Sequence, residues 1–271
     1  MKEISTRVLY NGVDMPGIGL GTYRMDDAAA ARTVAEALGL GYRMVDTASM
    51  YGNEEGVGQG IRSSGIPRED VFLVSKVWNT DQGYQRTVGA CEQSLKRLDT
   101  DYLDLYLIHW PKEQSFETWE AMEKLYRMGK LRAVGVSNFK IHHLQELSER
   151  SDMLPMINQV ELHPFYPQTR LRRFCEKLDV VVCSWAPLAR GRIAEIPQLK
   201  EIARSHGKTV SQIVLRWHCQ LSAVPIPKTV HADRLRENLD IFDFSLSSDD
   251  MKTISSLKKD RIGPDPDLIT F

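Results

Sequence analysis

The sequence lacks the features that mark membrane, secreted and nucleic-acid-binding proteins. No apolar run approaches the ~20 residues of a membrane span, and the opening stretch MKEISTRVLYNG contains no segment suited to a signal peptide. Lys and Arg number 35 against 36 Asp and Glu, so the formal net charge is −1 and gives no reason to expect a polyanion. We therefore expect a cytoplasmic protein with no nucleic-acid partner and no membrane association.

Cysteine is scarce, and no Pro- or Ser-rich linker divides the chain. The four cysteines (Cys91, Cys175, Cys183 and Cys219) form no C-x-x-C pair, so we interpret them as reduced thiols. Without a linker, the 271 residues are expected to form a single domain, 1–271.

Short apolar runs recur regularly along the chain. They are nearly continuous, as is typical of parallel strands covered on both faces. Their centres lie roughly 23 to 42 residues apart, which leaves room for a helix each time. One such intervening segment, 84–98, carries an apolar stripe at helical spacing. The expected strands are 17–21, 44–46, 71–77, 103–109, 133–138, 157–162, 180–186 and 223–227.

Eight strand–helix units predict an α/β fold, a single (β/α)8 TIM barrel. An open doubly wound sheet is the alternative, because periodicity does not give strand order. The stretch VLYNGVDMP predicts an N-terminal β-hairpin, with Asn11-Gly12 as its turn, that closes the barrel bottom. The run GIGLG lacks the G-x-G-x-x-G spacing of a dinucleotide-binding turn, which argues against a Rossmann domain.

Four polar side chains fall at or near the ends of the predicted strands. Asp46 follows the second strand, Tyr51 lies in its loop, Lys76 is near the end of the third, and His109 ends the fourth. Each alone has an ordinary explanation, such as a helix cap or a core histidine. However, a lysine inside an apolar strand needs a partner, and Asp46 on the neighbouring strand is the natural one. In a barrel, all four would converge at one mouth.

Several motifs make the chain similar to a known family. VDTASMYGNEE, LVSKVWN, LDLYLIHWP, AVGVSNF, INQVELHP, SWAPL and IPKT…RENLDIFDF, spanning about residues 7 to 247, together resemble the aldo-keto reductase family. The resemblance is closest to its compact microbial members, similar to 2,5-diketo-D-gluconate reductase. It implies the same barrel and an NAD(P)H-dependent oxidoreductase that reduces aldehydes or ketones to alcohols.

The resemblance also implies catalytic roles for Asp46, Tyr51, Lys76 and His109. Tyr51 would be the general acid, and the Lys76 ammonium would lower the pKa of its phenol. Asp46 would pair with Lys76, and His109 would orient the substrate carbonyl.

The implied cofactor is NADPH, with NADH as the alternative. His231 stands where relatives that prefer NADPH often carry arginine, so the preference could be modest. The cofactor-binding residues implied by the resemblance are Gly21, Thr22, Ser137, Asn138, Gln159, Trp185, Leu188, Gly191, Lys228, Thr229, His231, Arg234, Glu237 and Asn238.

The substrate is expected to be a small-molecule carbonyl compound, in a pocket lined by Tyr23, Trp78, Trp110 and Phe165. Only 14 residues follow Leu257, so the C-terminal cover found in some relatives is expected to be absent or reduced. The family's habit suggests a monomer. Two other functions are weighed: a cofactor-binding sensing subunit with little turnover, and a metal-dependent hydrolase. For the second, the strand ends offer too few ligands, and we expect no metal.

Overall fold

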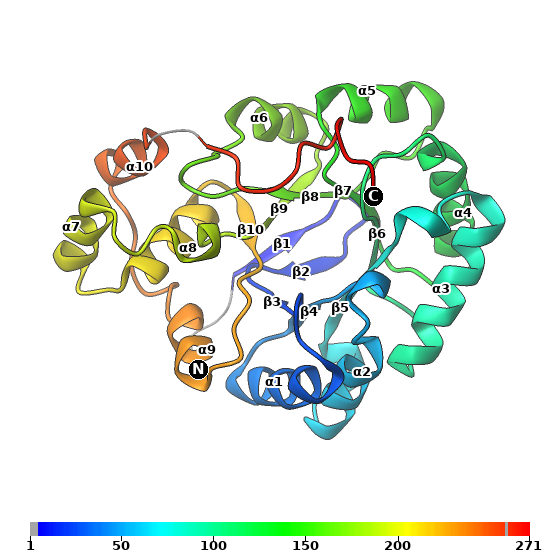
Figure 1. The fold of residues 1–271 in the computed structure, drawn as a ribbon, viewed down its shortest axis with the longest axis horizontal. Coiled ribbons are helices and arrows are strands. Elements are labelled where there is room, and N and C mark those ends of the chain that lie inside the picture. The colour runs from blue at the N-terminus through cyan, green and yellow to red at the C-terminus, as the bar shows by residue number, and fades with distance from the viewer. Residues whose placement is uncertain (1–4, 258–259) are drawn as a thin grey trace.

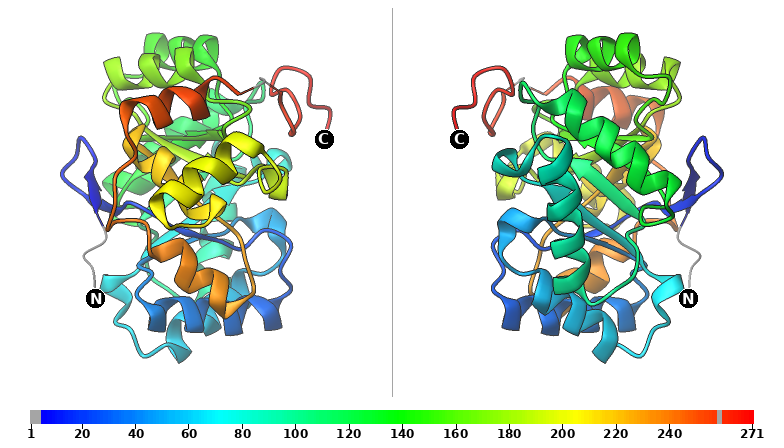
Figure 2. Two further views of the ribbon diagram at one scale, coloured as in Figure 1. Left: turned by 90° about the vertical axis from the view of Figure 1, so that its left-hand side faces the viewer. Right: turned by 90° about the vertical axis from the view of Figure 1, so that its right-hand side faces the viewer.

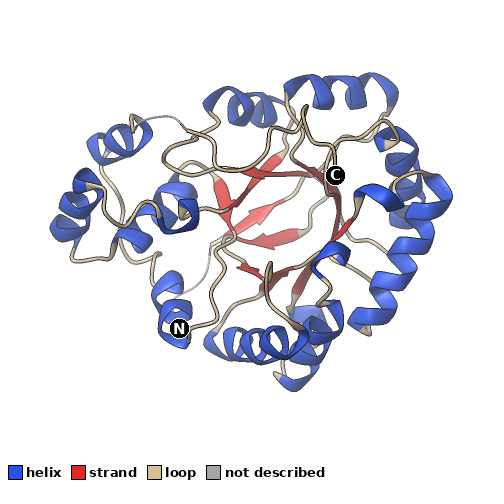
Figure 3. Cartoon of the chain, in the orientation of Figure 1, coloured by secondary structure: helices blue, strands red, loops and turns tan. Residues whose placement is uncertain are grey.

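An eight-stranded parallel sheet, curled into a barrel, lies at the centre of the molecule with helices around it (Figures 1 and 3). The structure is a computed structural model that describes residues 5–257 and 260–271. Neighbouring strands pair in chain order from β3 to β10. The strands are β3 (Leu20–Gly21), β4 (Met44–Asp46), β5 (Phe72–Val77), β6 (Leu105–Ile108), β7 (Val134–Ser137), β8 (Ile157–Glu161), β9 (Val181–Trp185) and β10 (Ala223–Pro225).

Backbone hydrogen bonds close the barrel between its first and last strands. The N–H of Gly19 donates to the carbonyl of Pro225 (3.1 Å), and the N–H of Gly21 donates to that of Pro227 (3.0 Å). These bonds leave no free sheet edge at β3 or β10, so the predicted barrel is confirmed and the alternative of an open sheet is excluded. The continuous apolar runs are explained by burial on both faces: all six residues of β5 are buried, Lys76 among them.

The helices pack on the outside of the strands, each with an apolar stripe turned inward. In α3, for example, Cys91, Leu95 and Leu98 are buried on one face, as the helical spacing predicted. Among the described residues, no helix is both long and apolar enough to cross a membrane. The helices are α1 (Asp27–Leu40), α2 (Glu54–Ser63), α3 (Tyr84–Leu98), α4 (Ser115–Arg127), α5 (Ile141–Arg150), α6 (Thr169–Lys177), α7 (Pro197–His206), α8 (Val210–Gln220), α9 (Ala232–Leu239) and α10 (Ser248–Ser255), with short 3-10 turns at η1 (Ser49–Tyr51), η2 (Arg68–Asp70), η3 (Asn79–Asp81) and η4 (Ala189–Gly191).

The predicted N-terminal hairpin is present and lies at one end of the barrel. Strands β1 (Thr6–Val8) and β2 (Asp14–Pro16) pair antiparallel, and the turn between them places Gly12 at φ 83°, a conformation that favours glycine. Leu9 and Met15 are buried against the core. Figure 2 shows the hairpin and the C-terminal segment on opposite sides of the barrel. The hairpin therefore covers the end that lies away from the carboxyl ends of the strands.

Candidate active site

One large cavity, of about 1070 Å³, opens at the carboxyl end of the barrel strands. Asp46, Ser137 and Trp185, the last residues of β4, β7 and β9, contribute to its wall. In a barrel the strand ends converge there, which brings together residues far apart in the chain. The predicted site residues that line it are Gly21, Tyr23, Asp46, Tyr51, Trp78, His109, Trp110, Ser137, Asn138, Gln159, Trp185, Leu188, Gly191, Lys228, Thr229, Arg234, Glu237 and Asn238.

Four predicted residues do not line the cavity. Thr22 is fully buried behind it, where its hydroxyl donates to the Asp46 carbonyl (3.0 Å). Lys76 lies beneath the wall and contacts two residues that line the cavity, Asp46 and Tyr51. Phe165 belongs to a turn beyond β8 and packs against the core with its ring 5.9 Å from that of His163. His231 is the N-cap residue of α9, is exposed, and is not among the residues that line the cavity.

Lys76 connects two of the other predicted catalytic groups. Its ammonium Nζ donates to Asp46 Oδ1 (2.7 Å), to the Thr47 carbonyl (2.8 Å) and to the Tyr51 hydroxyl (3.3 Å). Asp46 and Lys76 lie close together because β4 and β5 are neighbouring strands, and the η1 turn places Tyr51 next to them. The other carboxylate oxygen of Asp46 accepts a hydrogen bond from Gln159 Nε2 (2.7 Å). The ammonium is thus fully partnered despite complete burial.

Burial and charge oppose each other at Tyr51 and Lys76. Burial raises the pKa of Tyr51 and the Lys76 ammonium lowers it, but the net pKa stays above the ordinary 10.0. The Lys76 ammonium therefore lowers the pKa of the Tyr51 phenol, as expected from the sequence, but burial raises it by more in this structure. Burial alone would lower the pKa of Lys76, yet Asp46 and Tyr51 hold it above 10.5. At neutral pH, Lys76 is charged and Tyr51 keeps its proton.

His109 is the third group at the mouth and is held neutral. Burial, with the nearby Lys76 charge, lowers the pKa of its imidazole well below the ordinary 6.5. Its ring lies edge-on to Tyr51 (5.7 Å between centroids) and to Trp78 (5.0 Å). Within the described part of the chain, its Nδ1 has no hydrogen-bond partner. A neutral imidazole at this position can donate one N–H to a bound oxygen.

A second group of polar side chains adjoins this mouth. Trp185 Nε1 donates to Asn138 Oδ1 (2.8 Å), and Asn138 Nδ2 donates to the His109 carbonyl (3.0 Å). The Ser137 hydroxyl donates to the Gln159 carbonyl (2.8 Å). Asn138 adopts φ 65°, which asparagine tolerates well and which turns the chain sharply after β7. These bonds fix an indole and several amide and hydroxyl groups beside the catalytic residues.

Lys228 and Arg234 supply positive charge to another part of the same cavity. Gly21 lies close by: a Cβ there would come within 3.3 Å of Ile226 and 3.7 Å of Lys228, so glycine leaves space at the wall. Two cations and a glycine wall suit an anionic phosphate, while the amide and hydroxyl groups near Tyr51 suit a carboxamide. The donor set therefore fits a nicotinamide cofactor that carries phosphates.

The C-terminal segment contributes residues that sequence reasoning missed. Its residues Pro264 and Phe271 line the cavity. Arg24, in the loop before α1, also lines it and was not predicted. The ring of Phe271 stacks on Trp78 (centroids 5.9 Å apart) and lies edge-on to Trp110 (5.6 Å). Residues 260–271 therefore cover part of the mouth, so the C-terminal cover is present in the reduced form that the sequence allowed. Its irregular backbone carries no periodic signal that could have revealed this.

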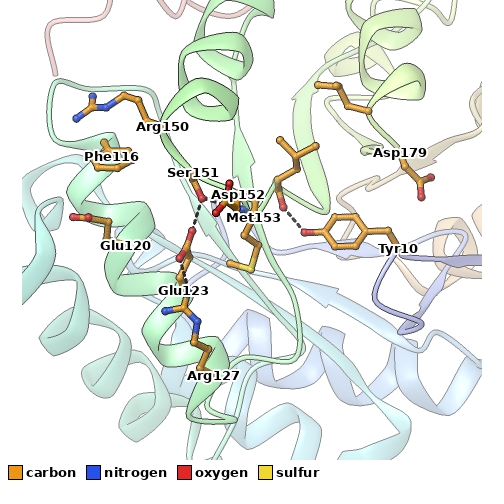
Figure 4. Close-up of a pocket in the computed structure, with 12 residues that line it drawn as sticks. Tyr10, Phe116, Glu120, Glu123, Arg127, Arg150, Ser151, Asp152, Met153 and Asp179 are labelled. Atoms are coloured by element: carbon orange, nitrogen blue, oxygen red, sulfur yellow. Dashed lines mark hydrogen bonds and ion pairs between the residues drawn. The ribbon is translucent and has the colours of Figure 1, made fainter.

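A second cavity, of about 600 Å³, lies beside the hairpin, along α4 and at the C-terminal end of α5 (Figure 4). Among its charged groups, Glu123 pairs with Arg127 (2.6 Å), and Arg150 lies over the Phe116 ring (3.8 Å). None of the predicted site residues lines it. We assign it no catalytic role.

His142, His143 and Asp267 form a cluster whose ligand atoms lie within 4.8 Å of one another. However, His143 Nδ1 accepts the N–H of Lys140 (3.0 Å), so in the neutral ring the proton sits on Nε2, the atom nearest Asp267. The Lys140 ammonium also lies 2.6 Å from Asp267 and would repel a cation. We interpret the group as a hydrogen-bonded cluster rather than a metal site.

The chain is similar to known proteins over nearly its whole length. The model of the "Aldo/keto reductase family" matches residues 17–259. "Glyoxal reductase" of Bacillus subtilis (strain 168) is 50% identical over 266 residues, covering 97% of this chain and 96% of that protein. "Methylglyoxal reductase DkgA" of Salmonella typhimurium is 41% identical over 265 residues, covering 96% of each. The crystal structure of a mutant of Gox0644 in complex with NADPH is 41% identical, covers 100% of both chains and has a TM-score of 0.95.

Proposed function

The chain belongs to the aldo/keto reductase family as an NADPH-dependent reductase of small carbonyl compounds, and we propose that short aldehydes and dicarbonyls, of the glyoxal and methylglyoxal type, are its substrates. We propose that Tyr51 is its general acid. The observation that carries this role is the position of the Tyr51 hydroxyl, 3.3 Å from the Lys76 ammonium at the wall of the cavity. Two relatives named for glyoxal and methylglyoxal support the substrate class.

In the proposed reaction, this chain supplies a proton and an oriented carbonyl. When bound, NADPH would supply the hydride that the carbonyl carbon receives. Tyr51 donates its proton to the carbonyl oxygen, and the neutral His109 holds that oxygen through an N–H. As Tyr51 loses its proton, the Lys76 ammonium stabilises the phenolate. Asp46 keeps Lys76 charged and in position through their 2.7 Å contact.

We propose that the cofactor lies along the cavity between two groups of residues. Ser137, Asn138 and Gln159 would hold the carboxamide beside Tyr51, and Trp185 would stack on the nicotinamide ring. Lys228 and Arg234 would hold the 2′-phosphate. The remaining proposed contacts are Gly21, Leu188, Gly191, Thr229, Glu237 and Asn238, whereas Thr22, buried behind the wall, is not among them. Their polar donors and the two cations match the chemistry of NADPH.

Further parts of the proposal concern the chain as a whole. Residues 1–271 are proposed to act as one domain, because the strands from β3 to β10 form a single barrel, and as a monomer, as is common in the family. All four cysteines are free thiols, three of them buried, which supports a reducing compartment such as the cytoplasm.

The test is NADPH oxidation by the wild-type protein with methylglyoxal, glyoxal and benzaldehyde, alongside NADPH binding without substrate. We expect turnover with all three carbonyls. Tight NADPH binding without turnover of any carbonyl would instead favour the sensing subunit, the alternative that the sequence left open.

A further inference from the structure

The C-terminal segment, residues 260–271, crosses the mouth of the cavity on the side of the barrel opposite the hairpin (Figure 2). It contacts the barrel at both of its ends. Near its start, Ile262 and Gly263 reach the end of β8, and at its finish Phe271 lies on Trp78 and Trp110. A segment without helix or strand depends on such contacts for its position, since it lacks the regular backbone hydrogen bonds of those elements.

Glu161, the last residue of β8, holds the start of the segment. Its Oε1 accepts the N–H of Ile262 (2.6 Å) and its Oε2 accepts the N–H of Gly263 (3.0 Å). The residue is only 2% exposed, and His163 Nε2 lies 2.9 Å from Oε1. Burial alone would raise the pKa of this carboxyl, but His163 and the two amides hold it below its ordinary value. The carboxylate is therefore ionised at neutral pH, and its charge strengthens the hydrogen bonds that the two backbone N–H groups donate to it.

The segment approaches the barrel so closely at Gly263 that no side chain fits. A Cβ there would lie 2.3 Å from Trp185 Cη2 and 2.7 Å from Glu161 Oε2. Such distances require something to move. The segment thus rests directly on the indole that lines the cavity.

Lys140 forms a second anchor, nearer the surface. Its ammonium pairs with Asp267 (2.6 Å) and with Asp265. Beyond this point, Lys112 Nζ donates to the Ile269 carbonyl (3.2 Å) and Asn79 Nδ2 donates to that of Phe271 (2.8 Å). Lys140 is partly exposed, so each of its pairs is expected to contribute little and to weaken in salt. Glu161 is the buried and stronger of the two anchors.

We propose that Glu161 is a positioning residue for substrate selection, which acts by holding the C-terminal segment so that Phe271 forms one wall of the substrate pocket. The inference rests on the proposed carbonyl reductase function. A substrate with an aromatic ring reaches the Phe271 wall, whereas methylglyoxal is too small to need it. Loss of the anchor therefore weakens the binding of aromatic aldehydes selectively.

The kinetic test compares benzaldehyde with methylglyoxal in the wild type, Glu161→Gln, Phe271→Ala and the double variant. In Glu161→Gln, we expect kcat/KM for benzaldehyde to fall about tenfold through KM, and that for methylglyoxal to stay within about twofold. The double variant should lose no more than the Phe271→Ala variant, because both changes act through one contact. Asp250→Asn is the matched control, since Asp250 also accepts from a histidine (3.0 Å) but on α10. Equal losses for both substrates, or additive losses, would overturn the proposal.

Hydrogen exchange tests the anchor without turnover. The amides of residues 260–271 should exchange faster in Glu161→Gln, and less so in Lys140→Met, than in the wild type. Unchanged exchange in Glu161→Gln would refute the anchoring itself. If the wild type reduces neither aldehyde, the proposed function fails while the exchange result still decides the anchor. If it reduces both and their ratio is the same in Glu161→Gln, only the inference fails.

Discussion

Lys76 Nζ lies 2.7 Å from Asp46 Oδ1, and the two side chains are 0% and 6% exposed. A buried ion pair is poor evidence for stability, because desolvation offsets much of the attraction. Here the same ammonium also reaches the Tyr51 hydroxyl. The pair is therefore best understood as the means of keeping a positive charge beside a phenol inside an apolar barrel.

Breaking this pair on one side should destabilise the protein. In Lys76→Met, the Asp46 carboxylate stays buried, and among the described residues Gln159 is its one remaining side-chain partner, so we expect a loss of about 3–5 kcal/mol in the free energy of unfolding. Asp46→Asn combined with Lys76→Met should recover part of that loss, because no buried charge remains. Urea denaturation measures both. A single variant as stable as the wild type would contradict the account.

The pH dependence of carbonyl reduction should be flat over a wide range. His109 has a pKa well below 6.5, so it stays neutral as the pH falls through that value, and Tyr51 has a pKa above 10.0, so it keeps its proton up to that value. We expect kcat/KM with methylglyoxal to be constant between about pH 6.5 and 10. His109 also adds to stability: because its folded-state pKa is depressed, this contribution is complete above about pH 6.5 and is lost as the pH falls toward the folded pKa. An activity titration centred near 6.5 that disappears in His109→Gln would argue against a neutral His109.

Preference for NADPH should depend on Arg234 and not on His231. Only NADPH carries the 2′-phosphate, and a charge-assisted hydrogen bond to it contributes about 1.5–3 kcal/mol. Arg234→Gln is therefore expected to lower kcat/KM for NADPH by at least about tenfold and that for NADH by no more than about twofold. His231→Gln is the control, since this exposed side chain does not line the cavity. If the two substitutions lowered kcat/KM for NADPH equally, the 2′-phosphate would have to bind somewhere other than Arg234.

Gly263→Ala should weaken NADPH binding. The added methyl group would meet Trp185 Cη2 at 2.3 Å, so either the indole tilts or the segment lifts. If Trp185 stacks on the nicotinamide ring as proposed, the Kd for NADPH rises several-fold. Gly39→Ala is the matched control, because a Cβ at Gly39, on α1, has nothing within 4 Å. Fluorescence titration of both variants distinguishes a local effect at Trp185 from a general one.

Much of the fold could be predicted because its strands carry a simple signal. Continuous apolar runs located the strands, and the barrel then required Asp46 and Lys76 to meet on neighbouring strand ends. The net pKa of Tyr51 could not be predicted in this way, because the extent of burial is a property of the packed structure. Phe271 was missed for a different reason: it ends an irregular segment held by side-chain contacts between residues distant in sequence, which leave no periodicity.

Tyr51→Phe tests the central claim most directly, through the rate of NADPH oxidation with methylglyoxal measured beside the Kd for NADPH. The variant removes the proton donor and keeps the ring. We predict a fall in kcat of at least about a thousandfold, in line with general acid catalysis, and a Kd within about twofold of the wild type. A variant that binds NADPH normally and still reduces methylglyoxal at a rate within about tenfold of the wild type would contradict the role of Tyr51 as the general acid.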